Sequence, residues 1–437
     1  MQAVILAAGE GTRLQPLTSI RSKHMFPFIG KPLLEHLLDA LRENGITDII
    51  LVTGYRETLL KDYFHDGSAW NVHIQYVHQD QYLGSGHAIG CAEPLVTDDY
   101  FLTLYGDLLV HPDAISALLH LHQTHHSPVM SVVKVTNPQQ YGVTLIENGK
   151  ITQIIEKPQT TRYGNLINAG IYIFPKSIFP VIRTTSPSSR GEIEITDTIR
   201  TMIADQISFF PNELPPQHWL DIGRPWDLLT ASKRLLSLKT PLPQIQGDVE
   251  PGASIHGPVH IAKDARIRSG VYIEGPVYIG PHADIGPNTY IRPYTNIEND
   301  VRIGHACEVK NSIILSETHI GHLSYIGDSI IGTKCNFGAS TITANLRFNE
   351  ANITVRIKEQ LQDSGRRKLG VIMGDNVKTG IAVQIMPGTK IGSDAWIGPG
   401  AQVSADVPPG SFYRRSQNGT MVSTPKGIGE DACQKKG

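Results

Sequence analysis

Cysteine is scarce in this sequence of 437 residues, and the four that occur, Cys91, Cys307, Cys335 and Cys433, form no Cys-x-x-Cys pair. Their scarcity and wide spacing argue against a disulfide framework and against a zinc site built on cysteine. An excess of either charge is also missing, because the formal net charge is only −2. Such a chain has no general attraction for nucleic acid or for an anionic membrane. A phosphate site in this protein must therefore depend on a few cations held close together.

Long apolar runs are missing as well. No apolar stretch approaches the roughly 20 residues that a membrane-spanning helix needs. The N-terminal segment Ala3-Val4-Ile5-Leu6 resembles a buried strand and is not preceded by the basic region of a signal peptide. We therefore expect a cytoplasmic protein without a membrane partner. The apolar fraction of 40% is sufficient for more than one hydrophobic core.

The most regular feature of the sequence is an aliphatic residue that returns at every sixth position from Ile255 onward. The series continues through Ile261, Ile267, Ile273, Ile279, Ile285, Ile291, Ile297, Ile303, Val309 and Leu315, with five-residue steps to Ile320 and Ile331. A period of six fits neither an amphipathic helix nor a hairpin meander. It predicts a solenoid of short parallel strands whose inward side chains stack from one coil to the next. We therefore expect a left-handed parallel β-helix of hexapeptide repeats.

Interruptions of this pattern predict the domain boundaries. The period stops after Thr343 and resumes at Met373, so we expect an external loop over residues 344–371. The proline-containing segment Thr240-Pro241-Leu242-Pro243 is typical of a stiff linker. These features predict a first domain over residues 1–238, a linker over 239–252, the β-helix over 253–410 and a C-terminal tail over 411–437. The tail is polar, and we expect it to be ordered only if it docks.

The first 238 residues alternate between buried strands and helices. Residues 2–8, 48–53 and 101–104 are mostly apolar and resemble buried strands, and Pro32 opens a helix with a leucine face. Alternation of this kind predicts a Rossmann-like α/β sheet with helices on both faces. Such sheets bind their ligands at the carboxyl ends of the strands.

A glycine-rich turn, Ala8-Gly9-Glu10-Gly11-Thr12-Arg13-Leu14, follows the first strand. Backbone N–H groups in such a turn can approach phosphate oxygens closely. The turn lacks both the GxxxxGK[ST] pattern and the third glycine of the dinucleotide motif, so by itself it fits an ordinary turn equally well. Arg13 and Lys23 place two cations in this one loop and favour a polyphosphate ligand.

Two further features leave a metal site open. Asp107 follows the strand at residues 101–104, where a carboxylate can bind a metal ion or can cap the next helix. Five histidines lie within residues 109–126, but no acidic or cysteine partner stands at ligand spacing. A solvated helix end is the better interpretation of these histidines.

Several motifs together resemble those of known enzymes. The segment Leu6–Leu14 with Lys23 and Lys31-Pro32 resembles the sugar-1-phosphate nucleotidyltransferases, and Gln79–Ala88 is similar to their uridylyltransferase branch. The segment Trp219–Gly223 looks more like the glucose-1-phosphate thymidylyltransferase branch. Together with a hexapeptide solenoid, these motifs resemble the bifunctional N-acetylglucosamine-1-phosphate uridylyltransferase/glucosamine-1-phosphate N-acetyltransferase family, especially its archaeal-type members, over about residues 1–410.

The resemblance implies a nucleotidyl transfer from UTP or dTTP to a sugar 1-phosphate, with release of pyrophosphate. Such a reaction needs positioning and charge neutralisation rather than an enzyme nucleophile. By resemblance, Arg13 and Lys23 hold the triphosphate, and Asp107 and Asp221 bind Mg²⁺. The same resemblance assigns nucleotide contacts to Ala8, Gly9, Gly11, Gln79 and Gly84, and sugar contacts to Gly142, Glu156, Lys157 and Asn168.

The resemblance also implies acetyl transfer from acetyl-CoA to the amine of glucosamine 1-phosphate, so that both reactions serve UDP-N-acetylglucosamine biosynthesis. The segment Gly321–Asp328 matches the family's motif and makes His322 the general base, a role that suits imidazole at neutral pH. Contacts to the amino-sugar phosphate fall on Arg292, Lys310, Tyr325, Asn336, Asn345 and Lys368. Ala339 and Ile381 match the acetyl-CoA cleft, although Ile381 stands where bacterial members have serine.

Family members assemble as homotrimers, and the resemblance implies the same here. Two alternatives stay open: a sugar-1-phosphate thymidylyl- or uridylyltransferase whose β-helix serves only oligomerisation or regulation, and a non-catalytic regulatory subunit. The presence of the cations, the carboxylates and His322 favours an enzyme with both activities. The sequence does not decide between UTP and dTTP, or between glucose-, glucosamine- and galactosamine-type sugars.

Overall fold

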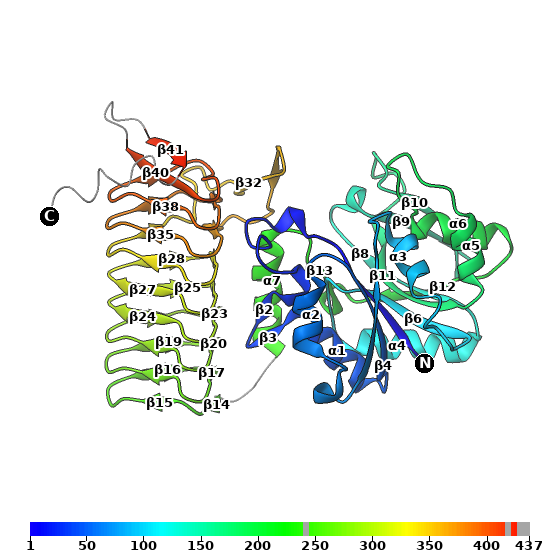
Figure 1. Ribbon diagram of the computed structural model, residues 1–437, viewed down its shortest axis with the longest axis horizontal. Coiled ribbons are helices and arrows are strands. Elements are labelled where there is room, and N and C mark those ends of the chain that lie inside the picture. Colours follow the sequence, from blue (N-terminus) through cyan, green and yellow to red (C-terminus); the bar gives the residue numbers. More distant parts are fainter. Residues whose placement is uncertain (239–243, 416–420, 426–437) are drawn as a thin grey trace. The chain divides into compact units, whose positions relative to one another are not determined.

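The computed structural model describes residues 1–238, 244–415 and 421–425 (Figure 1). The chain forms two compact units. The N-terminal unit contains Met1–Glu10, Ser22–Phe26 and Pro32–Ile222, and the solenoid unit contains Gly11–Arg21, Pro27–Lys31 and the described part of Gly223–Gly437. Of the predicted linker, residues 239–243 lie outside the described residues. In the described part of the chain, no helix has the combination of length and apolarity needed to cross a bilayer.

The N-terminal unit is built on a mixed sheet with the strand order β10-β9-β11-β6-β1-β4-β5. Its centre is parallel, because β1 (Ala3–Ala7) lies between β4 (Asp48–Thr53) and β6 (Tyr100–Tyr105). Beyond this centre lie β5 (His73–His78), β8 (Val129–Lys134), β9 (Gly142–Glu147), β10 (Lys150–Glu156), β11 (Leu166–Pro175) and β12 (Phe210–Leu214). The segments at residues 2–8, 48–53 and 101–104 are strands of one sheet, as predicted, and the structure shows that they are neighbours.

Helices cover both faces of this sheet. Alternate residues of β1 point to opposite faces: Ile5 packs into one core and Val4 into the other. The first core receives α1 (Leu33–Glu43), α2 (Glu57–Phe64) and α4 (Pro112–His125). The second core receives α3 (Ser85–Cys91), α5 (Ile178–Thr184) and α6 (Ile195–Ala204). The predicted Rossmann-like α/β architecture is confirmed.

A short antiparallel ribbon carries the two predicted metal-binding aspartates. It consists of β7 (Leu108–Val110) and β13 (Trp219–Asp221), with Leu108 opposite Asp221. The backbone N–H of Ile222 donates to the carbonyl of Asp107 at 3.0 Å and extends the ribbon by one pair. This pairing brings Asp107 next to Asp221, although more than a hundred positions separate them in the sequence.

The solenoid unit contains a parallel β-helix with three sheets, as the six-residue period predicted for the left-handed type (Figure 1). One sheet consists of β14 (Gln244–Ile245), β17 (Val259–Ile261), β20 (Val277–Ile279), β23 (Thr295–Ile297), β26 (Ile313–Ile314), β29 (Ile330–Ile331), β34 (Ile372–Met373) and β37 (Lys390–Ile391). The second consists of β15 (Asp248–Val249), β18 (Arg266–Ile267), β21 (Asp284–Ile285), β24 (Arg302–His305), β27 (His319–His322), β30 (Asn336–Phe337), β35 (Lys378–Thr379), β38 (Trp396–Ile397), β40 (Ser411–Arg415) and β41 (Met421–Pro425). The third consists of β16 (Ser254–His256), β19 (Tyr272–Glu274), β22 (Tyr290–Ile291), β25 (Glu308–Lys310), β28 (Tyr325–Gly327), β31 (Ile342–Thr343), β36 (Gln384–Ile385) and β39 (Gln402–Val403).

Along most of each sheet, inward aliphatic residues stack on aliphatic residues of the next coil. Ile285 pairs with Ile303, and Ile303 pairs with Ile320 on the next coil. The inward side chains form one continuous core in which most members are fully buried. The stability of such a stack depends on the packing of each coil against the coils next to it.

The structure corrects the predicted register at one point. Ile314, and not Leu315, occupies the inward position after Val309, because Ile297 pairs with Ile314. Three consecutive apolar residues, Ile313, Ile314 and Leu315, stand here, and all three are fully buried. The period alone could not choose among them.

The β-helix is also longer than predicted at both ends. Strands β14 and β15, within the predicted linker, already pair with β17 and β18, so the first coil begins at Gln244 rather than at residue 253. At the other end, β40 pairs with β38, so the first residues of the predicted tail continue the stack. Residues 416–420 and 426–437 of that tail lie outside the described residues.

The remaining element of interest is the loop over residues 344–371. It leaves the stack after β31 and returns at β34, as the interrupted period predicted. It contains a hairpin of β32 (Thr354–Ile357) and β33 (Gln360–Asp363).

Helix α7 (Pro225–Leu238) belongs to the solenoid unit by its contacts, and not to the N-terminal unit.

Candidate functional site

Lys23 and Asp107 form an ion pair at the carboxyl end of the central strands. Lys23 begins a short 3₁₀ helix (Lys23–Met25), and its Nζ donates to Oδ2 of Asp107. A Cβ atom added to Gly9, in the turn after β1, would lie 3.6 Å from this Nζ. The side chains of Lys23 and Asp107 are only 16% and 12% exposed. An ammonium and a carboxylate therefore compensate each other at the edge where open α/β sheets generally bind their ligands.

Asp107 and Asp221 supply a pair of oxygen donors on the β7–β13 ribbon. Asp221 is partly buried, and the hydroxyl of Tyr141 donates to its Oδ2 at 3.3 Å. Carboxylate oxygens are the ligands that Mg²⁺ prefers, so these residues fit the predicted metal. The alternative of a helix cap at Asp107 is wrong, because β7 follows Asp107 and His111 caps α4.

His24 lies directly beside this ion pair. It is fully buried, and its Nδ1 lies 2.9 Å from the hydroxyl oxygen of Ser22. Burial, and then the charge of Lys23, lower the pKa of His24 to about 3. The imidazole of His24 is therefore neutral and packs beside the Lys23–Asp107 pair without adding charge to it. No role was predicted for His24 from the sequence.

The Gln79–Ala88 motif forms the turn that leads into α3 and the first residues of that helix. The amide Nε2 of Gln79 lies 3.0 Å from Nδ1 of His87 and 3.4 Å from the carbonyl of Gly84. Gly84 has a φ of 99°, and a Cβ atom there would lie 2.8 Å from the carbonyl of Ile193. Only glycine meets both requirements. With its Nε2 engaged in this way, Gln79 keeps its Oε1 as the acceptor.

The predicted sugar contacts fall into two places. Gly142 pairs with Glu156 across β9 and β10, and Glu156 and Lys157 line a cavity of about 620 Å³. Asn168 lies on β11, where its Nδ2 donates to the hydroxyl of Tyr172 at 2.6 Å and its Oδ1 accepts from the N–H of Gly170.

Arg190 is a residue that the sequence analysis did not assign. It donates to Oε1 of both Glu156 and Glu194. Burial, and then the charge of Glu194, raise the pKa of Glu156 above its usual range. Charged and apolar residues alternate in the segment Arg190–Asp197, and this pattern could have drawn attention to Arg190. Its contact with Glu156 on β10, however, depends on the fold.

The rest of the glycine-rich turn belongs to the solenoid unit. Gly11 adopts φ 67°, and its carbonyl accepts from the hydroxyl of Thr18 at 2.9 Å. Arg13 lies on the 3₁₀ turn Thr12–Leu14 and is exposed. Arg21, at the end of this segment, forms an ion pair with Asp375 at 2.5 Å and donates to the carbonyl of Leu17. These contacts fix the shape of the segment that carries Arg13.

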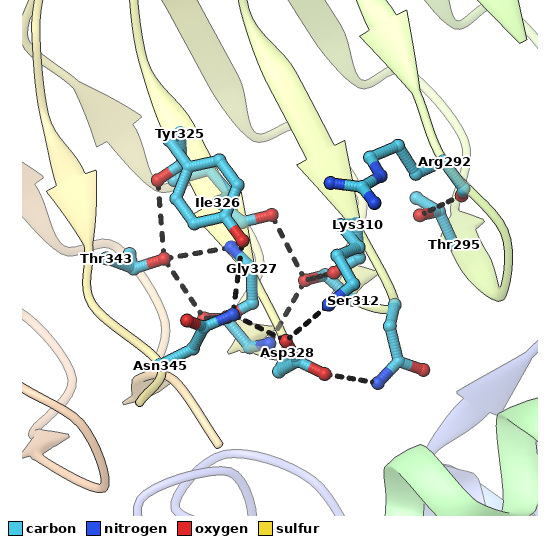
Figure 2. A network of polar contacts seen from close by, with 12 residues as sticks. Arg292, Thr295, Lys310, Ser312, Tyr325, Ile326, Gly327, Asp328, Thr343 and Asn345 are labelled. Carbon is cyan, nitrogen blue, oxygen red and sulfur yellow. Dashed lines mark hydrogen bonds and ion pairs between the residues drawn. The ribbon is translucent and has the colours of Figure 1, made fainter. Parts of the chain in front are cut away.

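On the β-helix, Asp328 connects several of the predicted amino-sugar contacts (Figure 2). Its Oδ2 accepts from Nδ2 of Asn345 at 2.6 Å and from Nζ of Lys310 at 3.4 Å. Nδ2 of Asn345 also donates to the hydroxyl of Tyr325 at 3.1 Å. Burial, and then the charge of Asp328, raise the pKa of Tyr325. Lys310, Tyr325 and Asn345 thus form one network, although they come from β25, β28 and the segment after β31.

Arg292 flanks this network on the same sheet. Its Nη1 donates to Glu308 at 2.8 Å, and its guanidinium lies 5.5 Å from the ring centre of Tyr290. Glu308 pairs in register with Tyr325 on the next coil. Figure 2 shows Arg292 and Lys310 close to each other, which gives the site two cations.

The other predicted residues of this site lie outside the network. His322 ends β27 at a corner of the solenoid, is exposed, and pairs in register with His305. Ala339 and Ile381 occupy the same corner on later coils, where the N–H of Ala382 donates to the carbonyl of Ala339. Asn336 is on the sheet of His319 rather than that of Tyr325, and Lys368 lies in the external loop opposite Leu346.

The structure also tests the clustered histidines. Among the described residues, His111, Asp113 and His218 are the one group of three possible ligands within reach of a single ion. The rings of His111 and His218 stack with a 19° angle between their planes, and Nδ1 of His111 accepts from the N–H of Asp113. Since the lone pairs of parallel rings do not converge on one point, this arrangement fits a stacked helix cap better than a metal site.

Comparisons with known proteins match both parts of the chain. A family model described as nucleotidyl transferase matches residues 2–237, and one described as the GMPPB C-terminal domain matches residues 273–386. A putative glucose-1-phosphate thymidylyltransferase from Bacillus anthracis is similar in structure, with a TM-score of 0.50, 29% identity, and coverage of 56% of this chain and 98% of that chain.

Two relatives match along nearly the whole chain. The bifunctional protein GlmU of Methanococcus maripaludis is 44% identical over 429 residues, which cover 98% of this chain and 100% of the relative. The bifunctional sugar-1-phosphate nucleotidylyltransferase/acetyltransferase of Sulfurisphaera tokodaii is 42% identical over 417 residues, which cover 95% of this chain and 100% of the relative. The chain therefore belongs to the family of bifunctional GlmU proteins, in which a nucleotidyltransferase domain precedes a β-helix.

Proposed function

We propose that this protein catalyses the last two steps of UDP-N-acetylglucosamine synthesis. The solenoid unit would acetylate glucosamine 1-phosphate with acetyl-CoA, and the nucleotidyl site would transfer UMP from UTP to the N-acetylated product. The observation that carries the proposal is the presence of both charge arrangements in one chain. These are the Lys23–Asp107 pair at the sheet edge and the Lys310–Asp328–Asn345–Tyr325 network on the β-helix.

In the nucleotidyl transfer, an oxygen of the sugar phosphate attacks the α-phosphorus of UTP, and the bond to the pyrophosphate group breaks. Arg13 would bind the β- and γ-phosphates, and the ammonium of Lys23 would bind the α-phosphate, where negative charge accumulates. Asp107 and Asp221 would hold Mg²⁺, which when bound neutralises phosphate charge. Lys23 would then exchange its contact with Asp107 for one with phosphate.

Recognition of the base and the sugar would use the remaining residues of the N-terminal unit. Oε1 of Gln79 would accept the N3–H of a pyrimidine, and the backbone of Ala8, Gly9, Gly11 and Gly84 allows close approach. Glu156, Asn168 and the backbone of Gly142 would bind sugar hydroxyls, with Lys157 beside them. Since uracil and thymine share this hydrogen-bonding edge, use of dTTP beside UTP is consistent with the same site.

In the acetyl transfer, the amine of glucosamine 1-phosphate attacks the thioester carbonyl of acetyl-CoA. His322 would accept the proton that the attacking nitrogen loses and would return it to the departing thiolate of CoA. Arg292, Lys310 and Lys368 would bind the phosphate, Tyr325, Asn336 and Asn345 would position the amino sugar, and acetyl-CoA would lie along Ala339 and Ile381. The exposure of His322 on a solenoid corner leaves room for these substrates.

Assembly as a homotrimer would complete the acetyl-transfer site. The corner that carries His322 also exposes Leu323 and Ile381, which are 56% and 61% exposed. Packing of a second copy against this corner would bury both side chains and enclose the cleft. Sedimentation equilibrium should then give three times the chain mass, whereas a monomeric mass would contradict this assembly.

A substrate panel tests the proposed function. The purified protein would be incubated with UTP or dTTP and with glucose 1-phosphate, N-acetylglucosamine 1-phosphate or galactosamine-type sugar phosphates, and pyrophosphate release would be measured. In parallel, glucosamine 1-phosphate and acetyl-CoA would be used to measure free CoA thiol. We expect both activities. Pyrophosphate without thiol release would favour the alternative in which the β-helix only supports assembly or regulation, and the absence of both would favour a regulatory subunit.

A further inference from the structure

Asp328 is a buried carboxylate that none of the assigned roles in acetyl transfer includes. Its side chain is 5% exposed, and it lies at a corner of the solenoid with φ 50°. Three side chains donate to it: Asn311 to Oδ1 at 2.6 Å, and Asn345 and Lys310 to Oδ2 at 2.6 and 3.4 Å (Figure 2). Burial of a carboxylate is unfavourable unless several hydrogen-bond donors compensate its charge. The three donors around Asp328 provide this compensation.

The charge of Asp328 determines how the amide of Asn345 is oriented. An ionised carboxylate only accepts hydrogen bonds, so the amide group that faces it must be NH₂ and not the carbonyl oxygen. The same Nδ2 also donates to the hydroxyl of Tyr325 at 3.1 Å. Both amide hydrogens are thereby engaged within the protein, and Oδ1 of Asn345 is the atom that can accept from a ligand.

The same polarity extends to Tyr325. Since its hydroxyl oxygen accepts from Asn345, its own proton is available for an acceptor other than Asn345. The carboxylate therefore fixes a chain of donors and acceptors: Asp328 accepts, Asn345 donates to Asp328 and Tyr325, Oδ1 of Asn345 accepts from the ligand, and Tyr325 donates.

We propose that Asp328 is a positioning residue that makes the acetyl-transfer site selective for a primary amine, because it holds Oδ1 of Asn345 as an acceptor for the amine N–H. This inference rests on the proposed acetyl transfer and deepens it. A hydroxyl in place of the amine can also donate one hydrogen bond, but it lacks the second N–H that remains on nitrogen after His322 has taken a proton. The amide oxygen would therefore hold the attacking nitrogen throughout the transfer.

The test is a double-variant cycle on acetyl transfer in the full-length protein. Asp328→Asn has almost the same size and shape as the native side chain but can face Asn345 in either sense. We expect it to lower kcat/KM for glucosamine 1-phosphate by about 10- to 100-fold, the range for a hydrogen bond to a charged group. Asn345→Ala should lower it by a similar factor, and adding Asp328→Asn to that variant should change it by less than about threefold, because the two residues act as one unit.

Two controls separate positioning from general damage. Asp300→Asn changes another aspartate at a left-handed solenoid corner, with φ 57° and an exposed side chain, and should leave acetyl transfer unchanged. The inhibition constant of glucose 1-phosphate, which has no amine, should not rise in Asp328→Asn, because Lys310, which would bind its phosphate, keeps its charge when it loses its partner Asp328. Uridylyl transfer to N-acetylglucosamine 1-phosphate should also be retained in every variant and reports a folded chain.

The outcomes are distinct. Full additivity of the two substitutions, or an equal weakening of glucose 1-phosphate inhibition, would overturn the inference and assign Asp328 to the stability of the corner. An unchanged protein that releases no CoA thiol from acetyl-CoA would overturn the proposed acetyl transfer itself, and the inference with it. A loss confined to the amine substrate, with non-additive variants, would support the positioning role.

Discussion

The ammonium of Lys23 donates to the carboxylate of Asp107, although the two residues are 84 positions apart in the sequence. In the structure each group compensates the charge of the other at the carboxyl end of the sheet. The proposed reaction gives each of them a different partner, phosphate for Lys23 and Mg²⁺ for Asp107. The ion pair is therefore the resting arrangement of two groups that would separate when nucleotide and metal bind.

Removal of the Lys23 ammonium tests this relationship. Lys23→Ala should lower the turnover of uridylyl transfer by about 10²- to 10³-fold, because one charged contact to the reacting phosphate is lost. Acetyl transfer by the same variant should be unchanged and serves as the internal control. Lys61→Ala removes a half-buried lysine that pairs with Glu57 and should leave both activities intact. Near-native pyrophosphate release from Lys23→Ala would contradict the assignment.

Removal of divalent metal should separate the two activities. Asp107 and Asp221 provide carboxylate oxygens for Mg²⁺ in the nucleotidyl site, whereas the proposed acetyl transfer uses only protein side chains. Addition of EDTA should therefore abolish uridylyl transfer, and excess Mg²⁺ should restore it. Release of CoA thiol should be the same with and without the chelator. Equal sensitivity of both activities would argue against metal-free acetyl transfer.

His322 is the residue on which the acetyl transfer most directly depends. His322→Ala should lower CoA release by about 10²- to 10⁴-fold, the usual contribution of a general base, without change in uridylyl transfer. His305→Ala provides a matched control, because His305 is exposed and pairs in register with His322 one coil away. If the two variants lost activity equally, a role in the structure of the corner would explain His322 better than proton transfer.

Acid should destabilise the N-terminal unit through His24. Burial lowers the pKa of His24 from 6.5 to about 3, so the unfolded chain takes up this proton first as the pH falls. The stabilisation is therefore complete above pH 6.5 and decreases as the pH falls from there toward 3. Between pH 7 and pH 5 the loss from this one group should be about 2 kcal/mol.

Hydrogen exchange of the β1 and β6 amides at pH 7 and pH 5 measures this loss. After correction for intrinsic exchange rates, the protection of the unchanged protein should fall more between these two pH values than that of His24→Gln. His73→Gln changes a histidine whose side chain is 63% exposed and should behave like the unchanged protein. An identical pH dependence in all three proteins would refute the buried-neutral state of His24.

The solenoid core should respond to the loss of a single isoleucine. Ile303 is fully buried and pairs with an isoleucine on each neighbouring coil. Ile303→Ala should cost about 2–5 kcal/mol, because it removes buried methyl groups and leaves a cavity in a rigid stack. Leu361→Ala, at a position 64% exposed on the external loop, should cost less than about 0.5 kcal/mol. Calorimetric unfolding of the two variants gives the comparison, and similar losses would contradict the stacked core.

Much of the architecture could be predicted because it repeats. The six-residue period forces one inward side chain per flat side of each coil, and the pairing of Ile285 with Ile303 follows from it. The prediction failed where the sequence allowed more than one inward residue. Residues 313–315 are all apolar, so either Ile314 or Leu315 could follow Val309 in the core. The packing of neighbouring coils selected Ile314. The first strands β14 and β15 were missed because their outward residues are polar and the linker prolines stand just before them.

The sequence by itself determined the two folds, the family's motifs and the residue types of both candidate sites, because local patterns and periodicities are properties of neighbouring residues. Only the tertiary structure decided which groups compensate one another, since that depends on contacts across long sequence separations. Lys23 forms an ion pair with Asp107, and Arg190 forms one with Glu156. Asp328 accepts hydrogen bonds from Asn345 and Lys310. The partners of a carboxylate depend on where the folded backbone places it. The spacing of residues in the sequence does not determine the distance between such partners.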